Sequence, residues 1–428
     1  MHVKSLRVKL DYGRTGLEVE LPDARVQAVL GLQPAPALEN PSAAIAEALA
    51  HPIGCAPLSE LAAGKQSACL VISDITRPVP NRILLPEVIR VLEAAGVPSD
   101  GIFILIATGT HRPSTEAEIL EMVGPEIAAG YRVLNHVAGD LETHRYLGET
   151  PNGVPIWVDS RYLDAEVKVS LALIEPHFMA GFSGGRKSIC PGICAMETVK
   201  IWHGPRFIGH ELSDSGSVRG NPVHEDSLYV ARKSGLQFIC DVTLDEQRRL
   251  TGVFAGEVEA AWLAGVERAR RVAVAPLDSP ADVVVTTCAG YPLDLTFYQA
   301  VKGMVGALPA LKPGGAIVIA SECAEGIGNA HFRDILLDSD DLEAFVKRTY
   351  EPGFFIPDQW EAHELWKAVK SAEVYVVASG IPAETLSRCF VKPVATVEEG
   401  VRQALETRGP DAKLVVIPKG PYVLPQVQ

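Results

Sequence analysis

Short, continuous apolar runs alternate with helical segments along the middle of the chain. The runs lie at residues 68–72, 102–106 and 167–174, and the apolar spacing between them predicts helices over 83–95 and from about residue 114. Runs of this kind are typical of strands that are buried on both faces. Their alternation with helices therefore predicts an α/β fold with a largely parallel sheet.

A second series of the same kind occupies the last third of the chain. Strands are predicted at 282–287, 316–320 and 373–379 and helices at 297–308 and 396–405, after a linker-like composition at 277–280. A chain of 428 residues is too long for one ordinary core. We therefore expect two α/β domains, over residues 1–275 and 276–428, with an active-site cleft between them.

Composition and charge exclude several classes of protein. With 47% hydrophobic and 21% charged residues, the chain is globular rather than disordered or fibrous. Its 53 acidic residues outnumber 39 basic ones, which argues against a nucleic-acid partner. The apolar runs are too short to cross a membrane, and the first residues lack signal-peptide features, so we expect a cytoplasmic protein with no membrane partner. The scattered cysteines indicate reduced thiols.

Polar segments follow the predicted strands at the point where each strand ends. Asp74, Thr76 and Arg77 follow the first run, His111 follows the second, and His177 follows the third. In parallel α/β sheets, ligands bind beyond the carboxyl ends of the strands. The first loop can bind a phosphate, a ribose or a carboxylate, although its acid and hydroxyl can equally cap a turn. Two histidines at equivalent strand ends favour acid–base chemistry over a purely structural role.

The most informative stretch is the glycine-rich segment over residues 180–192. Gly184 and Gly185 allow the backbone to approach an anion closely, and Arg186 and Lys187 add two positive charges. Neither the phosphate-loop pattern nor the G-x-G-x-x-G pattern is present, so a usual nucleotide-hydrolase or nicotinamide site is not supported. A tight glycine turn with surface cations is the structural alternative.

Two further groups of residues carry candidate chemistry. His203 stands beside Trp202 and is either a metal ligand or a residue at a helix end. Tyr298, Gln299 and Lys302 share one face of a predicted helix, where a phenol, an amide and an ammonium can hold an oxyanion. A solvated helix edge is the alternative.

Taken in order, these segments resemble the nickel-dependent lactate racemase family. The resemblance runs from about residue 70 to about residue 330 and rests on Ser-Asp-Ile-Thr-Arg-Pro, Gly-Thr-His-Arg, Pro-His-Phe, Gly-Phe-Ser-Gly-Gly-Arg-Lys-Ser, a later histidine and Tyr-Gln-Ala-Val-Lys-Gly. It implies an isomerase, a racemase or epimerase that inverts C2 of a small 2-hydroxy acid. It also implies nickel and the nickel-pincer nucleotide, a Ni(II)-pyridinium-3,5-bisthiocarboxylate mononucleotide that cofactor-synthesis enzymes load.

The resemblance implies a role for each matching residue. Lys187 attaches the cofactor covalently, His203 is the protein ligand to nickel, and His111 and His177 are the paired acid–base catalysts. The nucleotide is held by Asp74, Ile75, Thr76 and Arg77, and the substrate is bound by Arg77, Tyr298, Gln299 and Lys302. The first domain then carries the cofactor and the catalytic residues, and the second closes the cleft. The substrate gives its C2 hydride to the pyridinium while a histidine takes the hydroxyl proton, and the hydride returns to the opposite face.

Two other functions remain as alternatives. A carrier or sensor could bind a nucleotide or an organic acid without catalysis, although binding alone needs no pair of histidines. A phosphate-ester enzyme could use the glycine-rich loop, but the sequence has no evident carboxylate cluster for magnesium. The sequence contains no signal that sets the oligomeric state.

Overall fold

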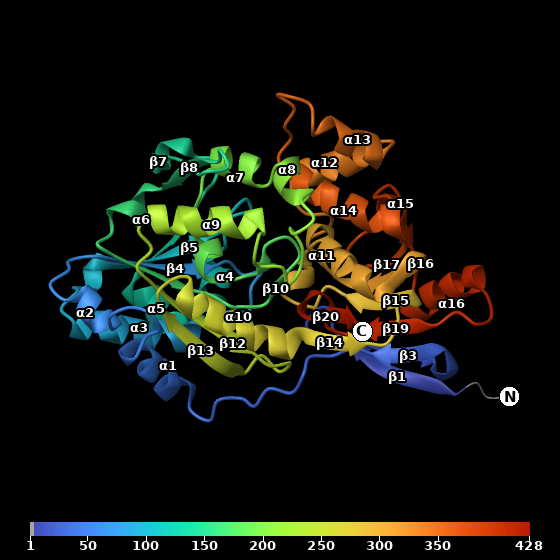
Figure 1. The fold of residues 1–428 in the computed structure, drawn as a ribbon, viewed down its shortest axis with the longest axis horizontal. Coiled ribbons are helices and arrows are strands. Elements are labelled where there is room, and N and C mark those ends of the chain that lie inside the picture. The colour runs from blue at the N-terminus through green and yellow to red at the C-terminus, as the bar shows by residue number, and fades with distance from the viewer. Residues whose placement is uncertain (1–3) are drawn as a thin grey trace. The chain divides into compact units, whose positions relative to one another are not determined.

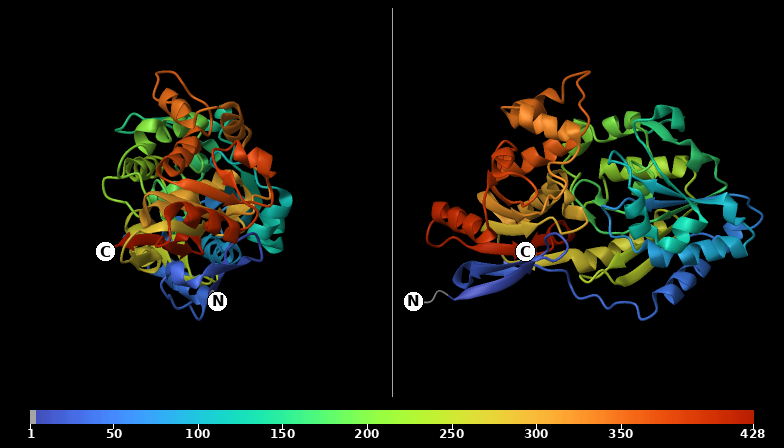
Figure 2. Two further views of the ribbon diagram at one scale, coloured as in Figure 1. Left: turned by 90° about the vertical axis from the view of Figure 1, so that its right-hand side faces the viewer. Right: turned by 180° about the vertical axis from the view of Figure 1, so that it is seen from behind.

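The computed structural model describes residues 4–428, which divide into two compact units. One unit is Pro34–Val272, and the other combines the described residues up to Gln33 with Ala273–Gln428. The expected boundary near residue 275 lies close to this division, but the start of the chain differs from the expected domain over 1–275. The reason is that β3 (Val26–Val29) pairs in parallel with β19 (Leu414–Ile417), so the first strands (blue) lie beside the last (red) in Figures 1 and 2.

The unit over Pro34–Val272 is built on a six-stranded sheet in the order β13-β12-β9-β4-β5-β6. Neighbouring strands are parallel except β12 and β13, which form an antiparallel pair. The strands of the unit are β4 (Ala68–Ser73), β5 (Ile102–Ala107), β6 (Arg132–Asn135), β7 (His144–Glu149), β8 (Pro155–Asp159), β9 (Val167–Leu171), β10 (Pro176–His177), β11 (Gly181–Phe182), β12 (Phe238–Leu244) and β13 (Leu250–Gly256). The helices are α1 (Pro41–Ala50), α2 (Leu58–Ala62), α3 (Asn81–Ala94), α4 (Glu116–Val123), α5 (Pro125–Gly130), α6 (Ser160–Asp164), α7 (Met196–Trp202), α8 (Pro205–Ile208), α9 (Pro222–Lys233) and α10 (Ala260–Ala273).

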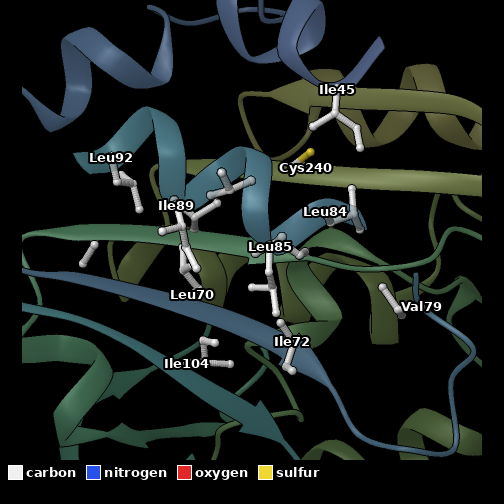
Figure 3. Close-up of a cluster of buried hydrophobic side chains, with 14 of the residues drawn as sticks. Ile45, Leu70, Ile72, Val79, Leu84, Leu85, Ile89, Leu92, Ile104 and Cys240 are labelled. Carbon is white, nitrogen blue, oxygen red and sulfur yellow. The ribbon is translucent and has the colours of Figure 1, made fainter. Parts of the chain in front are cut away.

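Helix α3 fixes β4 and β5 through one apolar face. Its buried positions include Leu85, Ile89 and Leu92, which recur at the spacing of a helix that covers a sheet. Figure 3 shows these side chains above Leu70 and Ile72 of β4. Truncating one such leucine to alanine typically costs about 2–5 kcal/mol, so this packing holds the carboxyl ends of both strands firmly in place.

The other unit contains a second six-stranded sheet, in the order β18-β17-β16-β15-β19-β3, in which all neighbours are parallel. Its further strands are β1 (Ser5–Leu10), β2 (Leu17–Pro22), β14 (Val274–Leu277), β15 (Ala281–Thr287), β16 (Leu311–Ala320), β17 (Glu373–Val377), β18 (Lys392–Pro393) and β20 (Leu424–Val427). Its helices are α11 (Phe297–Ala307), α12 (Ala330–Asp338), α13 (Leu342–Arg348), α14 (Gln359–Ser371), α15 (Ala383–Ser387) and α16 (Val397–Arg408). The predicted α/β class with largely parallel sheets is confirmed.

The helix expected from about residue 114 begins at Glu116, and Thr115 and Glu118 form a capping box at its start. Within the described chain the eight cysteines form no disulfide, and all but Cys55 are buried, as expected for reduced thiols. In residues 4–428, no helix combines the length and the apolar character that crossing a membrane requires.

Candidate active site

The polar segments expected to lie together do follow neighbouring strands. Strands β9, β4 and β5 are adjacent and parallel, so their carboxyl ends lie at the same edge of one sheet. His177 follows β9, Asp74 and Arg77 follow β4, and His111 follows β5. The topology of this unit therefore places the predicted acid–base and nucleotide-binding residues at one edge of its sheet.

Asp74 organises the loop after β4. Its Oδ1 accepts hydrogen bonds from the backbone N (3.2 Å) and Oγ1 (2.6 Å) of Thr76, and its Oδ2 lies 2.6 Å from Nδ1 of His111. Burial alone would raise the pKa of Asp74, but His111 and Thr76 together lower it below its ordinary value. The ionised carboxylate accepts the Nδ1 proton of His111 and holds the ring in place. Ile75 packs its side chain into the hydrophobic core of the unit.

Arg77 connects the loop after β4 to the segment after β9. Its Nη1 forms a salt bridge with Oε1 of Glu175, and little of either side chain is exposed. Glu175 was not singled out from the sequence. The available signal was position, because Glu175 directly precedes the Pro-His-Phe segment at the end of a buried strand.

His177 is buried, and both of its ring nitrogens are engaged. Nδ1 accepts hydrogen bonds from the backbone N–H groups of Met179 and Ala180, each at 3.3 Å, and Nε2 lies 3.0 Å from Nζ of Lys187. Because Nδ1 is an acceptor, the neutral ring carries its proton on Nε2. This is the opposite arrangement to that of His111.

Arg186 points into the protein rather than toward an external anion. Its side chain is 0% exposed and donates to Nδ1 of His224 and to the carbonyl oxygens of Ala180, Phe182, Ser183 and Gly184. Its guanidinium also stacks 3.7 Å from the centroid of the Trp262 ring, and burial lowers its pKa to about 9. The prediction that Arg186 adds charge to an anion site is therefore wrong. Its guanidinium instead donates four hydrogen bonds to the backbone of the loop that leads to Lys187.

The glycine turn encloses a carboxylate that belongs to the protein itself. The N–H of Gly185 donates to Oδ2 of Asp241 at 2.7 Å, and a Cβ added at Gly184 would lie 2.7 Å from the same oxygen. Burial raises the pKa of Asp241 to about 7, against the hydrogen bond from Gly185 and the charge of Arg186. The close approach of Asp241 and the φ of +85° together account for glycine at position 184.

Lys187 and His203 lie against the same indole. Nζ of Lys187 is 5.1 Å from the centroid of the Trp202 ring, and the ring centroid of His203 is 4.5 Å from it. The structure thus brings together the amine and the imidazole that the resemblance assigns to one cofactor. Among residues 4–428, no three His, Cys, Asp or Glu side chains are arranged to hold a metal ion. A nickel ion at His203 would therefore take its other ligands from the cofactor, as the resemblance implies.

The remaining predicted residues lie in the other unit, on α11. This helix follows β15, which lies between β16 and β19, where the strand order changes direction along the sheet. Such switch points are the usual ligand sites of α/β sheets. Ala289, just after β15, has a φ of 60°, which is strained for a residue with a side chain. Tyr298, Gln299 and Lys302 are all buried, so the alternative of a solvated helix edge is wrong.

Two residues of α14 complete this group. The hydroxyl of Tyr298 accepts a 2.8 Å hydrogen bond from Nε1 of Trp360, and Nζ of Lys302 donates to Oε1 of Gln299. Burial raises the pKa of Glu361 well above its usual range, although the charge of Lys302 opposes the shift. A protonated Glu361 leaves the positive charge of Lys302 uncompensated by this carboxyl. Neither Trp360 nor Glu361 was singled out from the sequence, because only helix packing brings α14 to α11.

Comparison with known proteins decides the family. Residues 12–216 match the lactate racemase N-terminal domain, and residues 277–424 match the lactate racemase C-terminal domain. The chain belongs to the lactate racemase family. The resemblance seen in the sequence is confirmed, and the prediction of an isomerase with it. The division between the units of this lactate racemase family member, at residues 272 and 273, falls in the interval between the two matched domains.

Individual relatives of this lactate racemase family member match nearly end to end. It is 35% identical over 421 residues to the lactate racemase of Thermoanaerobacterium thermosaccharolyticum, which covers 97% of this chain and 98% of that protein. It is also 35% identical over 378 residues to the lactate racemase of Lactiplantibacillus plantarum, covering 88% and 89% respectively. The structure of the T. thermosaccharolyticum lactate racemase apoprotein superposes with a TM-score of 0.91 at 34% identity, covering 98% of this chain and all 100% of that chain. A Thermotoga maritima protein, 19% identical with a TM-score of 0.70, shares the fold over 90% of this chain and 98% of its own.

Proposed function

We propose that this protein inverts C2 of a small 2-hydroxy acid in the cytoplasm, with a nickel-pincer nucleotide attached to Lys187. The observation that carries the proposal is the complementary state of two histidines. His111 donates from Nδ1 to the Asp74 carboxylate, whereas His177 accepts two backbone hydrogen bonds at Nδ1, so its neutral ring carries the proton on Nε2. A hydroxyl carbon that is inverted through a planar ketone needs one group that takes a proton and one that returns it.

The residues assigned to the cofactor fit the group. We assign Lys187 to covalent attachment, His203 to nickel, and residues 74–77 to the nucleotide. The position of Lys187 and His203 against the same Trp202 ring supports the first two assignments. When bound, the cofactor supplies a reversible hydride acceptor. Cofactor-synthesis enzymes are then required partners, because the chain has to be loaded before it acts.

The chain's own residues account for the proton steps and for binding. Starting from one enantiomer, Nε2 of His111 takes the hydroxyl proton as the hydride leaves C2. The resulting planar 2-oxo acid stays bound through its carboxylate while its other face is presented. His177 then returns a proton to the oxygen as the hydride returns to C2. The two histidines exchange roles for the other enantiomer. Binding of the carboxylate and hydroxyl is assigned to Arg77, Tyr298, Gln299 and Lys302.

The substrate is proposed from the relatives and is open to direct measurement. Lactate is the first acid to test, because both curated relatives carry the name lactate racemase. Protein co-produced with the cofactor-synthesis enzymes is incubated with single stereoisomers of lactate and of larger, acidic and sugar-derived 2-hydroxy acids. The proposal predicts that at least one acid reaches the same mixture from either stereoisomer. Loaded protein that binds such an acid but inverts none would instead be a carrier or sensor.

A further inference from the structure

The amine of Lys187 is held between a histidine and a tryptophan. Nζ lies 3.0 Å from Nε2 of His177 and 5.1 Å from the centroid of the Trp202 ring. His177 and Trp202 are buried, and Lys187 is half-buried. Arg186 donates four hydrogen bonds to backbone carbonyls that precede Lys187, so the amine is presented from a fixed turn.

The surroundings of His177 decide which partner donates in this contact. The backbone N–H groups of Met179 and Ala180 both point at Nδ1, so the ring proton is on Nε2 and faces Lys187. If Lys187 were an ammonium group, two hydrogen-bond donors would face each other at 3.0 Å. An uncharged amine can instead accept a hydrogen bond from the Nε2–H group of His177. The indole attracts a cation only weakly at 5.1 Å, which does not replace a buried hydrogen bond.

We propose that His177 has a second task, before any substrate reacts: it holds Lys187 as an uncharged amine, which is nucleophilic toward an acyl carbon once its lone pair leaves the hydrogen bond from Nε2. The inference rests on the proposed attachment of the cofactor at Lys187 and accounts for the choice of this lysine. In an acyl transfer, Nζ bonds to the acyl carbon and the bond from that carbon to its leaving group breaks. The nitrogen gives up one proton to the leaving group or to solvent, and nothing is oxidised or reduced.

Trace acetylation with acetic anhydride tests the state of the amine in the full-length chain produced without the cofactor pathway. The anhydride acylates uncharged amines and releases acetate, and peptide mass mapping gives the rate at Lys187 relative to half-buried Lys200 on α7. We expect His177→Gln to lower that ratio about tenfold and His210→Gln, at an exposed histidine of the same unit, to leave it unchanged. An unchanged or higher ratio in His177→Gln overturns the inference. His177→Asn provides the same test if thermal unfolding shows that the glutamine variant is not folded.

Intact mass after co-production with the cofactor-synthesis enzymes separates this inference from the proposed function. Both predict an adduct on Lys187 of the wild type and of His210→Gln. Only the second task of His177 predicts little or no adduct on His177→Gln. A wild type without the adduct, but with the expected acetylation ratios, would contradict the proposed attachment and leave the uncharged amine standing. An adduct that forms on His177→Gln as fast as on the wild type would contradict the second task and leave the proposed function standing.

Discussion

Nδ1 of His111 lies 2.6 Å from Oδ2 of Asp74, and the other oxygen of that carboxylate is bound twice by Thr76. The two partners stand on the loops after β4 and β5, which are parallel neighbours in one sheet. The carboxylate thus selects the form of His111 that is protonated at Nδ1, whose neutral ring can accept a proton at Nε2. The sheet, rather than a flexible loop alone, sets this pairing.

Replacing Asp74 by asparagine should slow racemisation by about 10²–10⁴-fold. The side-chain oxygen of the variant has to face the two donors of Thr76, so its NH₂ group faces Nδ1 of His111 and forces the proton onto Nε2. Measuring kcat/KM from both stereoisomers checks this, with Asp100→Asn at an exposed position as the control. A variant at residue 74 with the wild-type rate would show that the pairing is not used in catalysis.

Asp241 should make stability depend on pH. Its pKa rises from 3.8 to about 7 on folding, so the folded state holds the proton more tightly than the unfolded state. Its contribution to stability is therefore full below about pH 4 and is lost as the pH rises to about 7. Asp241→Asn keeps an acceptor for Gly185 but cannot titrate. The free energy of unfolding of the variant should therefore fall less steeply with pH than that of the wild type, by up to about 1.4 kcal/mol per pH unit. Urea unfolding across this window measures the slopes, and equal slopes in both proteins would refute the expectation.

Arg186→Lys should destabilise the protein by about 3–5 kcal/mol. A lysine has three donors on one nitrogen and cannot reach the carbonyl oxygens and the imidazole that the guanidinium binds. Arg232→Lys is the matched control, because Arg232 is half exposed in its ion pairs and the change should cost less than about 1 kcal/mol. Urea unfolding compares the two variants, and similar small losses would mean that the buried hydrogen bonds do not stabilise the loop.

Lys302→Gln should raise KM for the 2-hydroxy acid by about 10–100-fold, the typical effect of losing a charge-assisted hydrogen bond. Because the charge of Lys302 opposes the rise in the pKa of Glu361, losing that charge should raise this pKa further and favour the neutral carboxyl. Lys312→Gln, which removes an exposed ion pair with Asp282, serves as the control. An unchanged KM in the Lys302 variant would argue that another residue binds the carboxylate.

Features that are local in the sequence could be predicted before the structure was known. Continuous apolar runs predicted β4, β5 and β15, and polar residues directly after the first two predicted where His111 and Asp74 would lie. Strand β16 begins at Leu311, earlier than its apolar run at 316–320, because the exposed residues 312–314 carry no apolar signal. The strands before Pro34 were expected to belong to the domain over 1–275, but they belong to the other unit. The pairing of β3 with β19 that places them there leaves no local trace in the sequence.

Contacts between segments that lie far apart in the sequence could not be predicted from local patterns. Nothing near Gly185 in the sequence indicates that its N–H binds Asp241, and nothing near Tyr298 indicates Trp360. Arg186 shows the same limit for a single residue. In the sequence, a cation beside a glycine turn is typical of an anion site at the surface. Only the tertiary contacts of Arg186 show that its side chain is buried.

The central claim is that C2 is inverted by a hydride that leaves and returns within one site. The most direct measurement uses one enantiomer of the 2-hydroxy acid substrate labelled with deuterium at C2, converted in ordinary water by protein that carries the cofactor. The account predicts that the opposite enantiomer forms with its deuterium retained, because the hydride does not exchange with solvent. Loss of deuterium to solvent in step with inversion would contradict the account and indicate removal of C2 hydrogen as a proton.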